Sequence, residues 1–505
     1  MKRDISSKVI DLENLTKKLE VERTGRTIGL CHGVFDLLHS GHIEHFQECA
    51  NLVDLLVVSV TTDSNVKKGP GRPINSINHR LTSLAGIEFI DYVVSSDRPS
   101  AVEIIKQIQP DYYFKGPDYV TNGVNVDTAG NLSAEEKAVL DFGGKMLFTK
   151  SELRSSSSII NAMTEKSDEE KEIINHVKKF MKENPIQSLI EKMKSKRVVI
   201  IGEIIFDEYI FTESLGKSGK HPLVAEREIF RKEFYGGIAP LVNTYRSVLD
   251  NSHVKVLSIR NSRKLDSQSK YLNDVIIDKK YSDIVKTRYI NEKTNTFMYE
   301  LYQLDDSFIS NINEQLLLKK LKSASTDCDL LIALDFGHGL ITPIIRDYMC
   351  ENFDNFALNV QKNAGNKGFS NLSKYKSADL IVMNGAELEL ELKQKGLDVG
   401  SAAKIIHKNM GSKIVAITDG ASGLVLTNGD QVVRVPTFRV GNIVDRTGAG
   451  DALFAVLSLF SLVVDDLIVL GYLGNLAGSV NLSWFANEKS VTIEDIIQIT
   501  TYGLK

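Results

Sequence analysis

Cysteine is scarce in this sequence of 505 residues, which has only Cys31, Cys49, Cys328 and Cys350. The four lie far apart and form no CxxC pair. Closely spaced cysteines are what predict a structural zinc site or a disulfide framework, so the sequence predicts neither. We expect the protein to be located in a reducing cytoplasm.

Long hydrophobic runs and an excess of positive charge are also missing. The longest apolar stretch, from Ala452 to Val464, falls well short of the about 20 residues that a membrane-spanning helix needs. The first residues contain no apolar segment of the secretory type. The net charge of −4 argues against a nucleic-acid binder, which would carry a concentrated basic surface. We therefore expect small-molecule partners, with no nucleic acid and no membrane.

What the sequence does contain is the composition of an ordinary globular protein, with 42% hydrophobic and 25% charged residues. Because a single core stops growing at roughly 250–300 residues, at least two domains are expected. Short β-branched runs alternate with amphipathic segments, which predicts α/β domains built on parallel strands. The predicted strands include Thr27–Cys31, Leu55–Val60, Tyr92–Val94, Tyr112–Phe114, Val198–Ile201, Leu330–Leu334, Leu380–Met383 and Ile414–Thr418.

A charged stretch with helical spacing of its apolar residues separates the two runs of strands. We interpret it as a helical linker over residues 166–190, broken near Pro185. This divides the chain into a first domain over residues 1–165 and a second over residues 191–505.

The first candidate site follows the first predicted strand, in the string GVFDLLHSGH that ends at His42. His39 and His42 are three apart at a predicted helix start, so both side chains share one helical face. Imidazole groups there can stabilise charge on a phosphorus undergoing transfer, and the exposed helix amides can bind phosphate oxygens. An HxxH pair alone could equally be a metal pair or two unrelated surface histidines.

The whole string GVFDLLHSGH is specific, and it resembles the signature of the cytidylyltransferase-like nucleotidyltransferases. The resemblance implies that His39 and His42 are catalytic. The basic loop around Gly69 suits triphosphate charge, although by itself it could be an exposed turn, and the later serine run could be only a helix cap. The nucleotide-binding residues implied are Gly33, Phe35, Lys68, Arg72, Lys115, Asp118, Ser155, Ser156 and Ser157.

Over Thr27–Ala162 the sequence is similar to the nucleotidyltransferase part of the bacterial bifunctional heptose enzymes. These phosphorylate heptose 7-phosphate at its anomeric carbon and then adenylylate the product. The likeness departs after Tyr119, in the segment VTNGVNVDTAGNLSAEEKAV. The acceptor of the transfer reaction is therefore left open.

The second candidate site lies in the string DRTGAGDA, from Asp445 to Ala452, before a predicted apolar helix that starts near Leu453. Backbone N–H groups of Gly448, Ala449 and Gly450 at a helix start can form an anion hole for a transferring phosphoryl group. Asp451 is then placed to take a proton from the attacking hydroxyl. A glycine turn capped by an aspartate is the alternative interpretation. No GxxxxGK[ST] motif is present, which excludes a P-loop mechanism.

The string DxTGAGD resembles the C-terminal signature of the ribokinase-like sugar kinases. The resemblance implies MgATP as a substrate, a monovalent cation near the anion hole and a homodimer. It places Asn384 and Glu387 around Mg²⁺ and its waters, and Gly420 and Gly423 near the nucleotide. The sugar-binding residues that it implies are Asp207, Gly236 and Gly237.

Three departures from the heptose kinases surround the expected sugar pocket. Glu203 stands where an aspartate is usual, Pro240 where an asparagine is usual, and SGKHPLVA replaces a proline-rich segment. The phosphate machinery keeps its pattern, so we expect the ATP chemistry to be retained with a different sugar. The order of the two domains is the reverse of the familiar fusion, in which the kinase comes first.

The sequence thus predicts a Rossmann-like nucleotidyltransferase domain followed by a ribokinase-like kinase domain. We expect the kinase to phosphorylate a sugar or sugar phosphate, and the transferase to join the product to a nucleotide from ATP or CTP. A CDP-alditol synthase acting on glycerol or ribitol phosphate is an alternative. Another is a chain in which one domain is active and the other is a binding module.

Overall fold

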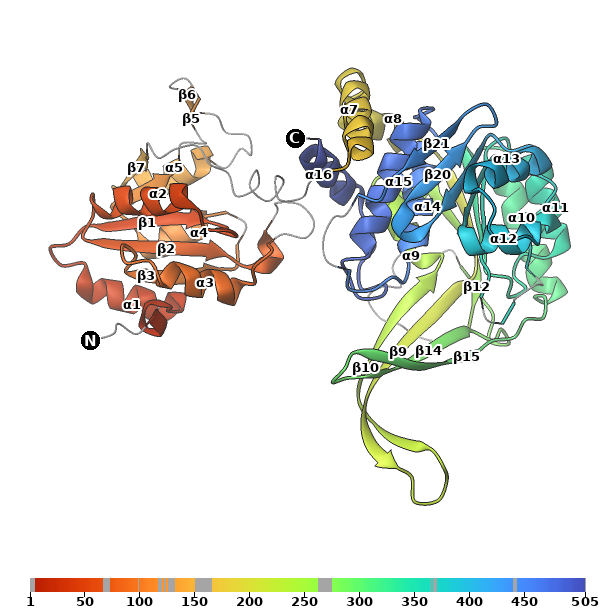
Figure 1. The fold of residues 1–505 in the computed structure, drawn as a ribbon, viewed down its shortest axis with the longest axis horizontal. Coiled ribbons are helices and arrows are strands. Elements are labelled where there is room, and N and C mark those ends of the chain that lie inside the picture. Colours follow the sequence, from red (N-terminus) through yellow and green to blue (C-terminus); the bar gives the residue numbers. More distant parts are fainter. Residues whose placement is uncertain are drawn as a thin grey trace. The chain divides into compact units, whose positions relative to one another are not determined.

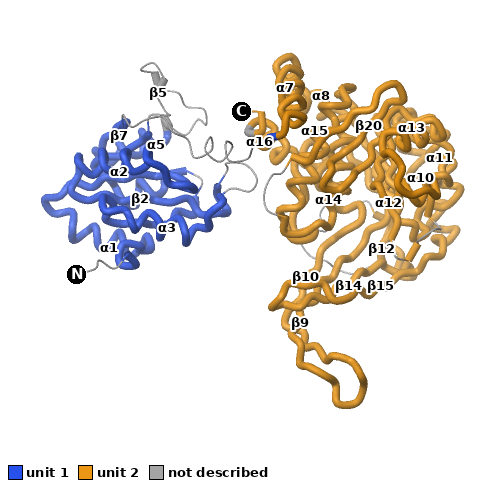
Figure 2. Tube along the Cα trace, in the orientation of Figure 1, with its two compact units in different colours: residues 1–166 blue, residues 167–505 orange. Residues whose placement is uncertain are grey.

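The computed structural model describes residues 5–66, 73–98, 100–116, 120–121, 124–125, 132–149, 166–261, 275–363, 365–366, 370–438 and 443–504. The chain forms two compact units, Met1–Lys166 and Ser167–Lys505 (Figure 2). Six predicted site residues lie outside the described residues: Lys68, Arg72, Asp118, Ser155, Ser156 and Ser157.

The first unit is built on a five-stranded parallel sheet with the strand order β3-β2-β1-β4-β7 (Figure 1). Its elements are η1 (Ile5–Lys8), α1 (Leu12–Glu22), β1 (Ile28–Gly33), α2 (Ser40–Ala50), β2 (Leu55–Thr61), η2 (Asp63–Asn65), α3 (Ile77–Ala85), β3 (Tyr92–Ser96), α4 (Val102–Ile108), β4 (Tyr112–Lys115), β5 (Val120–Thr121), β6 (Val124–Asn125), α5 (Leu132–Leu140) and β7 (Lys145–Phe148).

The topology of this sheet determines where a ligand can enter. The chain moves outward from β1 through β2 to β3, then returns to place β4 on the other side of β1. Ligands of open parallel sheets bind at the carboxyl ends of the strands where the order reverses in this way. Gly33 ends β1 and Lys115 ends β4, so two predicted nucleotide-binding residues lie at the reversal point.

The second unit carries an eight-stranded sheet with the order β11-β8-β16-β17-β18-β19-β20-β21. The strands are parallel from β11 to β19, and β20 and β21 are antiparallel. Its elements are α7 (Asp168–Glu183), α8 (Ile186–Lys194), β8 (Val198–Gly202), β9 (Ile204–Lys217), β10 (Val224–Gly237), α9 (Ala239–Arg246), η4 (Asn251–His253), β11 (Val254–Leu257), β12 (Ile259–Arg260), β13 (Ile276–Ile277), β14 (Ile284–Asn291), β15 (Thr296–Gln303), α10 (Asn311–Ser325), β16 (Leu330–Asp335), α11 (Pro343–Asn352), β17 (Phe356–Val360), η6 (Leu372–Lys374), β18 (Leu380–Asn384), α12 (Gly385–Leu392), α13 (Val399–Met410), β19 (Ile414–Thr418), η7 (Gly420–Ser422), β20 (Leu424–Thr427), β21 (Val432–Val435), α14 (Ala449–Phe460), α15 (Leu467–Asn481) and α16 (Ile493–Gly503).

Helices cover both faces of the large sheet (Figure 1). One face packs against α7, α8, α9, α14, α15 and α16, and the other against α10, α11, α12 and α13. Helices α14 and α15 are apolar nearly all round and almost completely buried, as expected for helices inside a large core. This rigid pair holds the start of α14, where Asp451 lies, against the sheet.

A second, four-stranded sheet with the order β10-β9-β14-β15 belongs to the same unit and is called the lid sheet below. Its β9–β10 hairpin extends away from the rest of the unit (Figure 1). The first part of β9 is buried and its last residues are exposed. The buried part carries Asp207, so the lid sheet contributes the predicted sugar-binding carboxylate.

The fold-class prediction is confirmed, and each of the eight predicted strands overlaps an observed one. The predicted break near Pro185 is also observed, because Pro185 is the N-cap residue between α7 and α8. Both helices pack into the core of the second unit, α7 through side chains such as Val177 and α8 through side chains such as Leu189. Helix α14 begins at Ala449, earlier than the predicted start near Leu453. Within the described residues, no helix combines the length and apolarity needed to cross a membrane.

Candidate active sites

In the first unit, the two predicted histidines lie at the start of α2. His39 is the N-cap residue and its side chain makes no capping hydrogen bond, while His42 lies in the first turn. Their rings stack with centroids 3.8 Å apart. The prediction that the pair shares one face of a helix start is therefore confirmed. The stacked imidazoles sit next to backbone N–H groups that are oriented to attract an anion.

Phe35 and Gly33 lie beside these two imidazole rings. Phe35 has the left-handed backbone angle φ of 49°, unusual for a residue with a bulky side chain. This turns its ring edge-on to His42, with centroids 5.5 Å apart, and over Gly33. A Cβ atom at Gly33 would lie 2.8 Å from the Phe35 ring, so the close approach requires glycine. The structure thus places these two predicted residues beside the histidines.

Sequence reasoning did not assign a role to Asp36 or Arg80, which hold this loop. Asp36 is buried and accepts hydrogen bonds from the backbone N–H groups of Ile74 and Asn75, at 2.8 and 2.9 Å. The Arg80 guanidinium is buried and donates to the carbonyl oxygen of Val34 at 2.6 Å. Both side chains position the chain that carries Phe35. Asp36 belongs to the GVFD string, which was the available signal for it.

Lys115, a predicted phosphate ligand, ends β4 in a buried ion pair. Its ammonium nitrogen lies 2.6 Å from a carboxylate oxygen of Glu135 on α5. Next to it on β1, His32 contacts the Ser59 hydroxyl at 2.7 Å. Burial, followed by the charge of Lys115, lowers the pKa of His32 to about 4, so this imidazole is neutral at pH 7.

In the second unit, the glycines of the DRTGAGDA string form the start of α14. Gly448 is the N-cap residue, has φ of 80° and offers no side chain for capping. A Cβ atom there would lie 2.9 Å from Oδ1 of Asn487. Asp445 braces the same loop by accepting hydrogen bonds from the backbone N–H groups of Thr447 and Ala486. The first amides of α14 are therefore held in place without a capping side chain.

Asp451 lies in the first turn of α14, directly beside these amides. Burial raises the pKa of its carboxyl to about 7, and a hydrogen bond donated by the Gln361 side chain partly opposes that rise. Gln361 follows β17 and was not recognised in the sequence, because no local motif marks it. A carboxylate that titrates near neutral pH is suited to accept a proton from a hydroxyl group.

A cavity of about 340 Å³ opens beside the start of α14. It brings together four predicted residues, Gly420, Gly423, Ala449 and Gly450. Its volume is within the range of small-molecule sites. The other lining residues are Thr418, Ala421, Thr437, Ile443, Arg446, Leu453, Asn475, Gly478, Ser479 and Leu482.

Asn384 and Glu387, the residues predicted to order Mg²⁺, form a reciprocal capping box at the start of α12. One carboxylate oxygen of Glu387 accepts the N–H of Asn384 at 2.9 Å, and the other accepts the N–H of Lys362 at 3.1 Å. Burial raises the pKa of Glu387. With both oxygens already accepting backbone hydrogen bonds, this pair fits an ion held through water molecules rather than by direct coordination.

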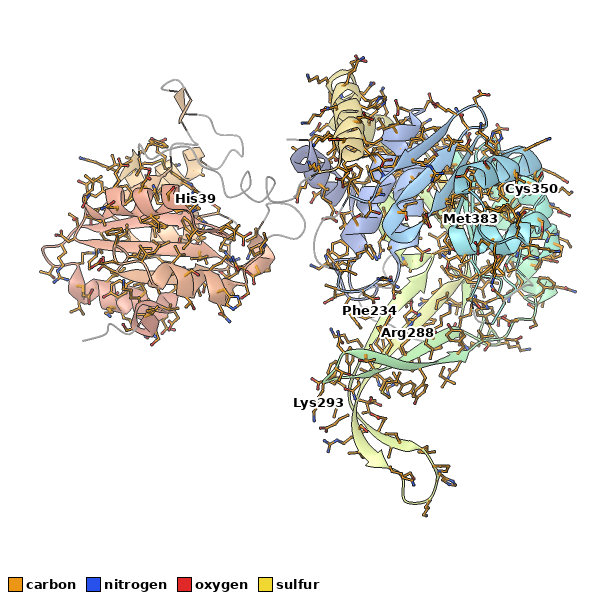
Figure 3. The ribbon with its side chains drawn as sticks, in the orientation of Figure 1. His39, Phe234, Arg288, Lys293, Cys350 and Met383 are labelled. Atoms are coloured by element: carbon orange, nitrogen blue, oxygen red, sulfur yellow. The ribbon has the colours of Figure 1, made fainter. Side chains whose placement is uncertain are left out.

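Asp207 forms an ion pair with Arg288 on β14, labelled in Figure 3, at 2.6 Å. The pair is buried, and Arg288 also contacts Glu300 at 2.9 Å. A Cβ atom at Gly236 would lie 2.1 Å from Oδ2 of Asp207, which explains why glycine is required there. Gly237 likewise has φ of 64°. The structure brings the three predicted sugar-binding residues together and adds Arg288.

The unusual Glu203 is completely buried and supports the loop that follows β16. Its two carboxylate oxygens accept hydrogen bonds from the backbone N–H groups of Phe336 and His338, each at 3.1 Å. Burial, and then the charge of Asp335, raises the pKa of Glu203. Pro240 lies in the first turn of α9, a position where a helix tolerates proline. Both departures are accommodated by the backbone of this fold.

Comparison with known families agrees with the two units. The family described as Cytidylyltransferase-like matches residues 30–163, and the pfkB family carbohydrate kinase matches residues 347–483. A solved structure of phosphofructokinase-2 from Escherichia coli is similar, with 13% identity and a TM-score of 0.49, over 61% of this chain and 99% of that chain.

Curated relatives are similar to part of the chain. The bifunctional protein HldE of Campylobacter fetus is 37% identical over 28% of this chain and 30% of its own length. That of Helicobacter hepaticus is 37% identical over 27% of this chain and 28% of its own length. The chain thus spans less than a third of the length of these two relatives. Each unit of the chain thus contains a segment that matches one of these two families.

Proposed function

We propose that this protein is a bifunctional enzyme that makes a nucleotide-activated sugar. The second unit phosphorylates a sugar or sugar phosphate with MgATP. The first unit then joins the resulting sugar phosphate to a nucleotide from ATP or CTP and releases pyrophosphate. The observation that carries this proposal is the pair of helix starts, one bearing two stacked imidazoles and the other a carboxylate with a pKa near 7.

For the kinase, the proposed base is Asp451, which takes the proton of the attacking sugar hydroxyl. The N–H groups of Gly448, Ala449 and Gly450 stabilise the negative charge on the phosphoryl group as it is transferred. The nucleotide occupies the cavity that Gly420 and Gly423 line. Mg²⁺, ordered through waters near Asn384 and Glu387, supplies charge neutralisation of the phosphates. A monovalent cation near the anion hole stays a prediction.

The sugar is proposed to bind between Asp207, Gly236 and Gly237. Besides Arg288, the buried Lys286 on β14 adds positive charge here, with its ammonium 5.7 Å from the centre of the Phe336 ring. Arg288 shares its charge with Asp207 and Glu300, so Lys286 is the cationic side chain that favours a phosphorylated acceptor. The resemblance to heptose enzymes suggests a heptose-like sugar.

For the transferase, His39 and His42 are proposed to stabilise the charge on the α-phosphorus as the sugar phosphate attacks. Gly33, Phe35 and Lys115 would contact the nucleotide. Lys115 can do so only by sharing its charge with Glu135. The contributions of Lys68, Arg72, Asp118 and Ser155, Ser156 and Ser157 stay predictions, as does a cytoplasmic location.

We also propose that the protein forms a homodimer through the lid sheet. Tyr299 and Leu301 alternate along β15 and share one face of the strand, and both are exposed. Exposed apolar faces of this kind mark protein interfaces. Light scattering should give twice the mass of one chain, and replacement of both Tyr299 and Leu301 by serine should give a monomer.

The coupled reaction is tested by supplying ATP, CTP, Mg²⁺ and a panel of heptose and pentose phosphates. ADP and pyrophosphate should both form with at least one sugar, and mass spectrometry should detect the nucleotide sugar. Formation of neither product with any sugar would reject the proposal. Pyrophosphate from CTP with glycerol or ribitol phosphate would instead identify a CDP-alditol synthase, and ATP binding without ADP formation would identify a kinase unit that serves as a binding module.

A further inference from the structure

The fold of the first unit brings together three side chains that are apart in the sequence. Cys31 lies on β1, and His45 and Cys49 lie one turn apart on α2. All three are buried, and one ligand atom from each lies within 4.8 Å of the others. Within the described residues, no other group of three such side chains comes so close. Thiol and imidazole groups are the ligands that zinc and other thiophilic ions prefer.

The spacing of the atoms agrees with coordination of one ion. The sulfur atoms of Cys31 and Cys49 are 3.7 Å apart. Two thiolates on one tetrahedral zinc, each about 2.3 Å from the ion, would lie about 3.8 Å apart. The Cys49 sulfur is 3.8 Å from Nε2 and 3.9 Å from Nδ1 of His45, so it is nearly equidistant from the two ring nitrogens. The imidazole must therefore turn for the three groups to bind a common ion.

The surroundings of His45 also favour ion binding. Its Nδ1 atom lies 2.7 Å from the hydroxyl of Thr149, and that hydroxyl donates to the carbonyl oxygen of Lys115. In the tautomer in which Nδ1 donates to Thr149, Nε2 is unprotonated and can bind a metal. Histidines that bind metals are usually oriented by such a hydrogen bond from the other ring nitrogen.

We propose that Cys31, His45 and Cys49 bind one thiophilic divalent cation, above all Zn²⁺. Each cysteine releases its thiol proton to solvent, so two thiolates balance the two positive charges, a neutral imidazole is the third ligand, and a water molecule takes the fourth tetrahedral position. A buried site with no net charge avoids the cost of an unpaired buried ion. Because the ion joins β1 to α2, it stiffens the connection that carries His39 and His42.

Formation of a disulfide between Cys31 and Cys49 is the competing use of the same pair. The proximity of His45 has no part in a disulfide, whereas it completes a set of two thiolates and one imidazole. The contacts therefore favour the ion.

The test uses the full chain, reduced, treated with a chelator and titrated with Co²⁺. We expect a thiolate-to-cobalt absorption band that saturates at one equivalent and disappears when Zn²⁺ is added. Cys31→Ser and Cys49→Ser should abolish the band. Cys328→Ser and Cys350→Ser, which change cysteines of the second unit, are the matched controls and should retain it.

The proposal is overturned if the unsubstituted chain gives no band, or if the band survives in both Cys31→Ser and Cys49→Ser. It is also overturned if the two thiols disappear on air oxidation of the Zn²⁺-treated chain with a mass loss of two hydrogens. Should the serine variants fail to fold, X-ray absorption of the Zn²⁺-loaded unsubstituted chain decides. Two sulfur ligands and one nitrogen ligand support the proposal, and a shell without sulfur rejects it.

Discussion

Helices α2 and α14 both begin without a capping side chain, but they carry different reactive side chains in their first turns. In several helices the side chain of the N-cap residue accepts a hydrogen bond from the first N–H groups. Ser167 does so in α7 and Asp398 in α13. His39 and Gly448 do not. N–H groups at a helix start attract anions, which is why we propose these two starts as binding places for phosphate.

The difference between the two helix starts lies in what accompanies the amides. Helix α2 carries two stacked imidazoles, and α14 carries one carboxylate whose pKa is near 7. A sugar hydroxyl must lose a proton to attack phosphorus, whereas a sugar phosphate is already ionised and needs no base. The side chains thus match the two nucleophiles that we propose, a hydroxyl in the second unit and a phosphate in the first.

The largest effect is expected for Asp451→Asn. Loss of the base should lower the rate of ADP formation by about 10²–10⁴-fold, the usual contribution of general base catalysis. Pyrophosphate release from a sugar 1-phosphate prepared beforehand should be unchanged, because the first unit needs no such base. An equal fall in both rates, each measured by a coupled assay, would contradict separate sites.

His42→Ala should act in the opposite sense. Removal of one group that stabilises charge in the transition state typically costs about 10²–10³-fold, and this loss should appear in pyrophosphate release. ADP formation should stay at the level of the unsubstituted enzyme. His79→Ala, which removes an exposed histidine of the same unit, is the control and should leave both rates unchanged. A fall in ADP formation with His42→Ala would contradict the assignment of His42 to the transfer reaction alone.

The kinase rate and the rate of pyrophosphate release should also differ in their dependence on pH, although by less than in the two substitutions above. The pKa of Asp451 is raised to about 7, and only the ionised form accepts a proton. Below pH 7 the kinase rate should therefore fall roughly tenfold for each pH unit, and above it the rate should level off. The rate of pyrophosphate release should not show this fall below pH 7. A kinase rate that stays constant between pH 5 and pH 8 would exclude Asp451 as the base.

The smallest effect is expected for Gln361→Leu. The hydrogen bond from Gln361 stabilises the ionised carboxylate, so its removal should raise the pKa of Asp451 further. The midpoint of the kinase pH profile should move upward by up to about one unit, with little change in the rate at high pH. Gln47→Leu in the first unit is the control. A midpoint that does not move, or moves downward, would remove Gln361 from this role.

The architecture and the two helix starts could be predicted because their signals are local. Buried parallel strands appear as continuous β-branched runs, and β8 (Val198–Gly202) and β19 (Ile414–Thr418) coincide closely with such runs. The strings GVFDLLHSGH and DRTGAGDA each place their reactive residues within a few positions of one another, so the motif itself encodes the geometry.

Contacts between distant residues could not be predicted in this way. Gln361 meets Asp451 across 90 positions, and Arg288 meets Asp207 across 81 positions. The pairing of Cys31 with Cys49 likewise depends on how α2 packs against β1, and the cysteine spacing gave no sign of it. These neighbours are set by the register of the sheets and the packing of helices on them, which a single sequence does not reveal.

The central claim, that two chemistries reside in two separate sites, is tested most directly by mixing two full-length variants. Asp451→Asn alone and His42→Ala alone should each fail to convert the sugar and nucleotides into nucleotide sugar. An equimolar mixture should regain the coupled reaction, because the sugar phosphate made by one variant can diffuse to the other. A mixture that stays as inactive as either variant alone would contradict the account.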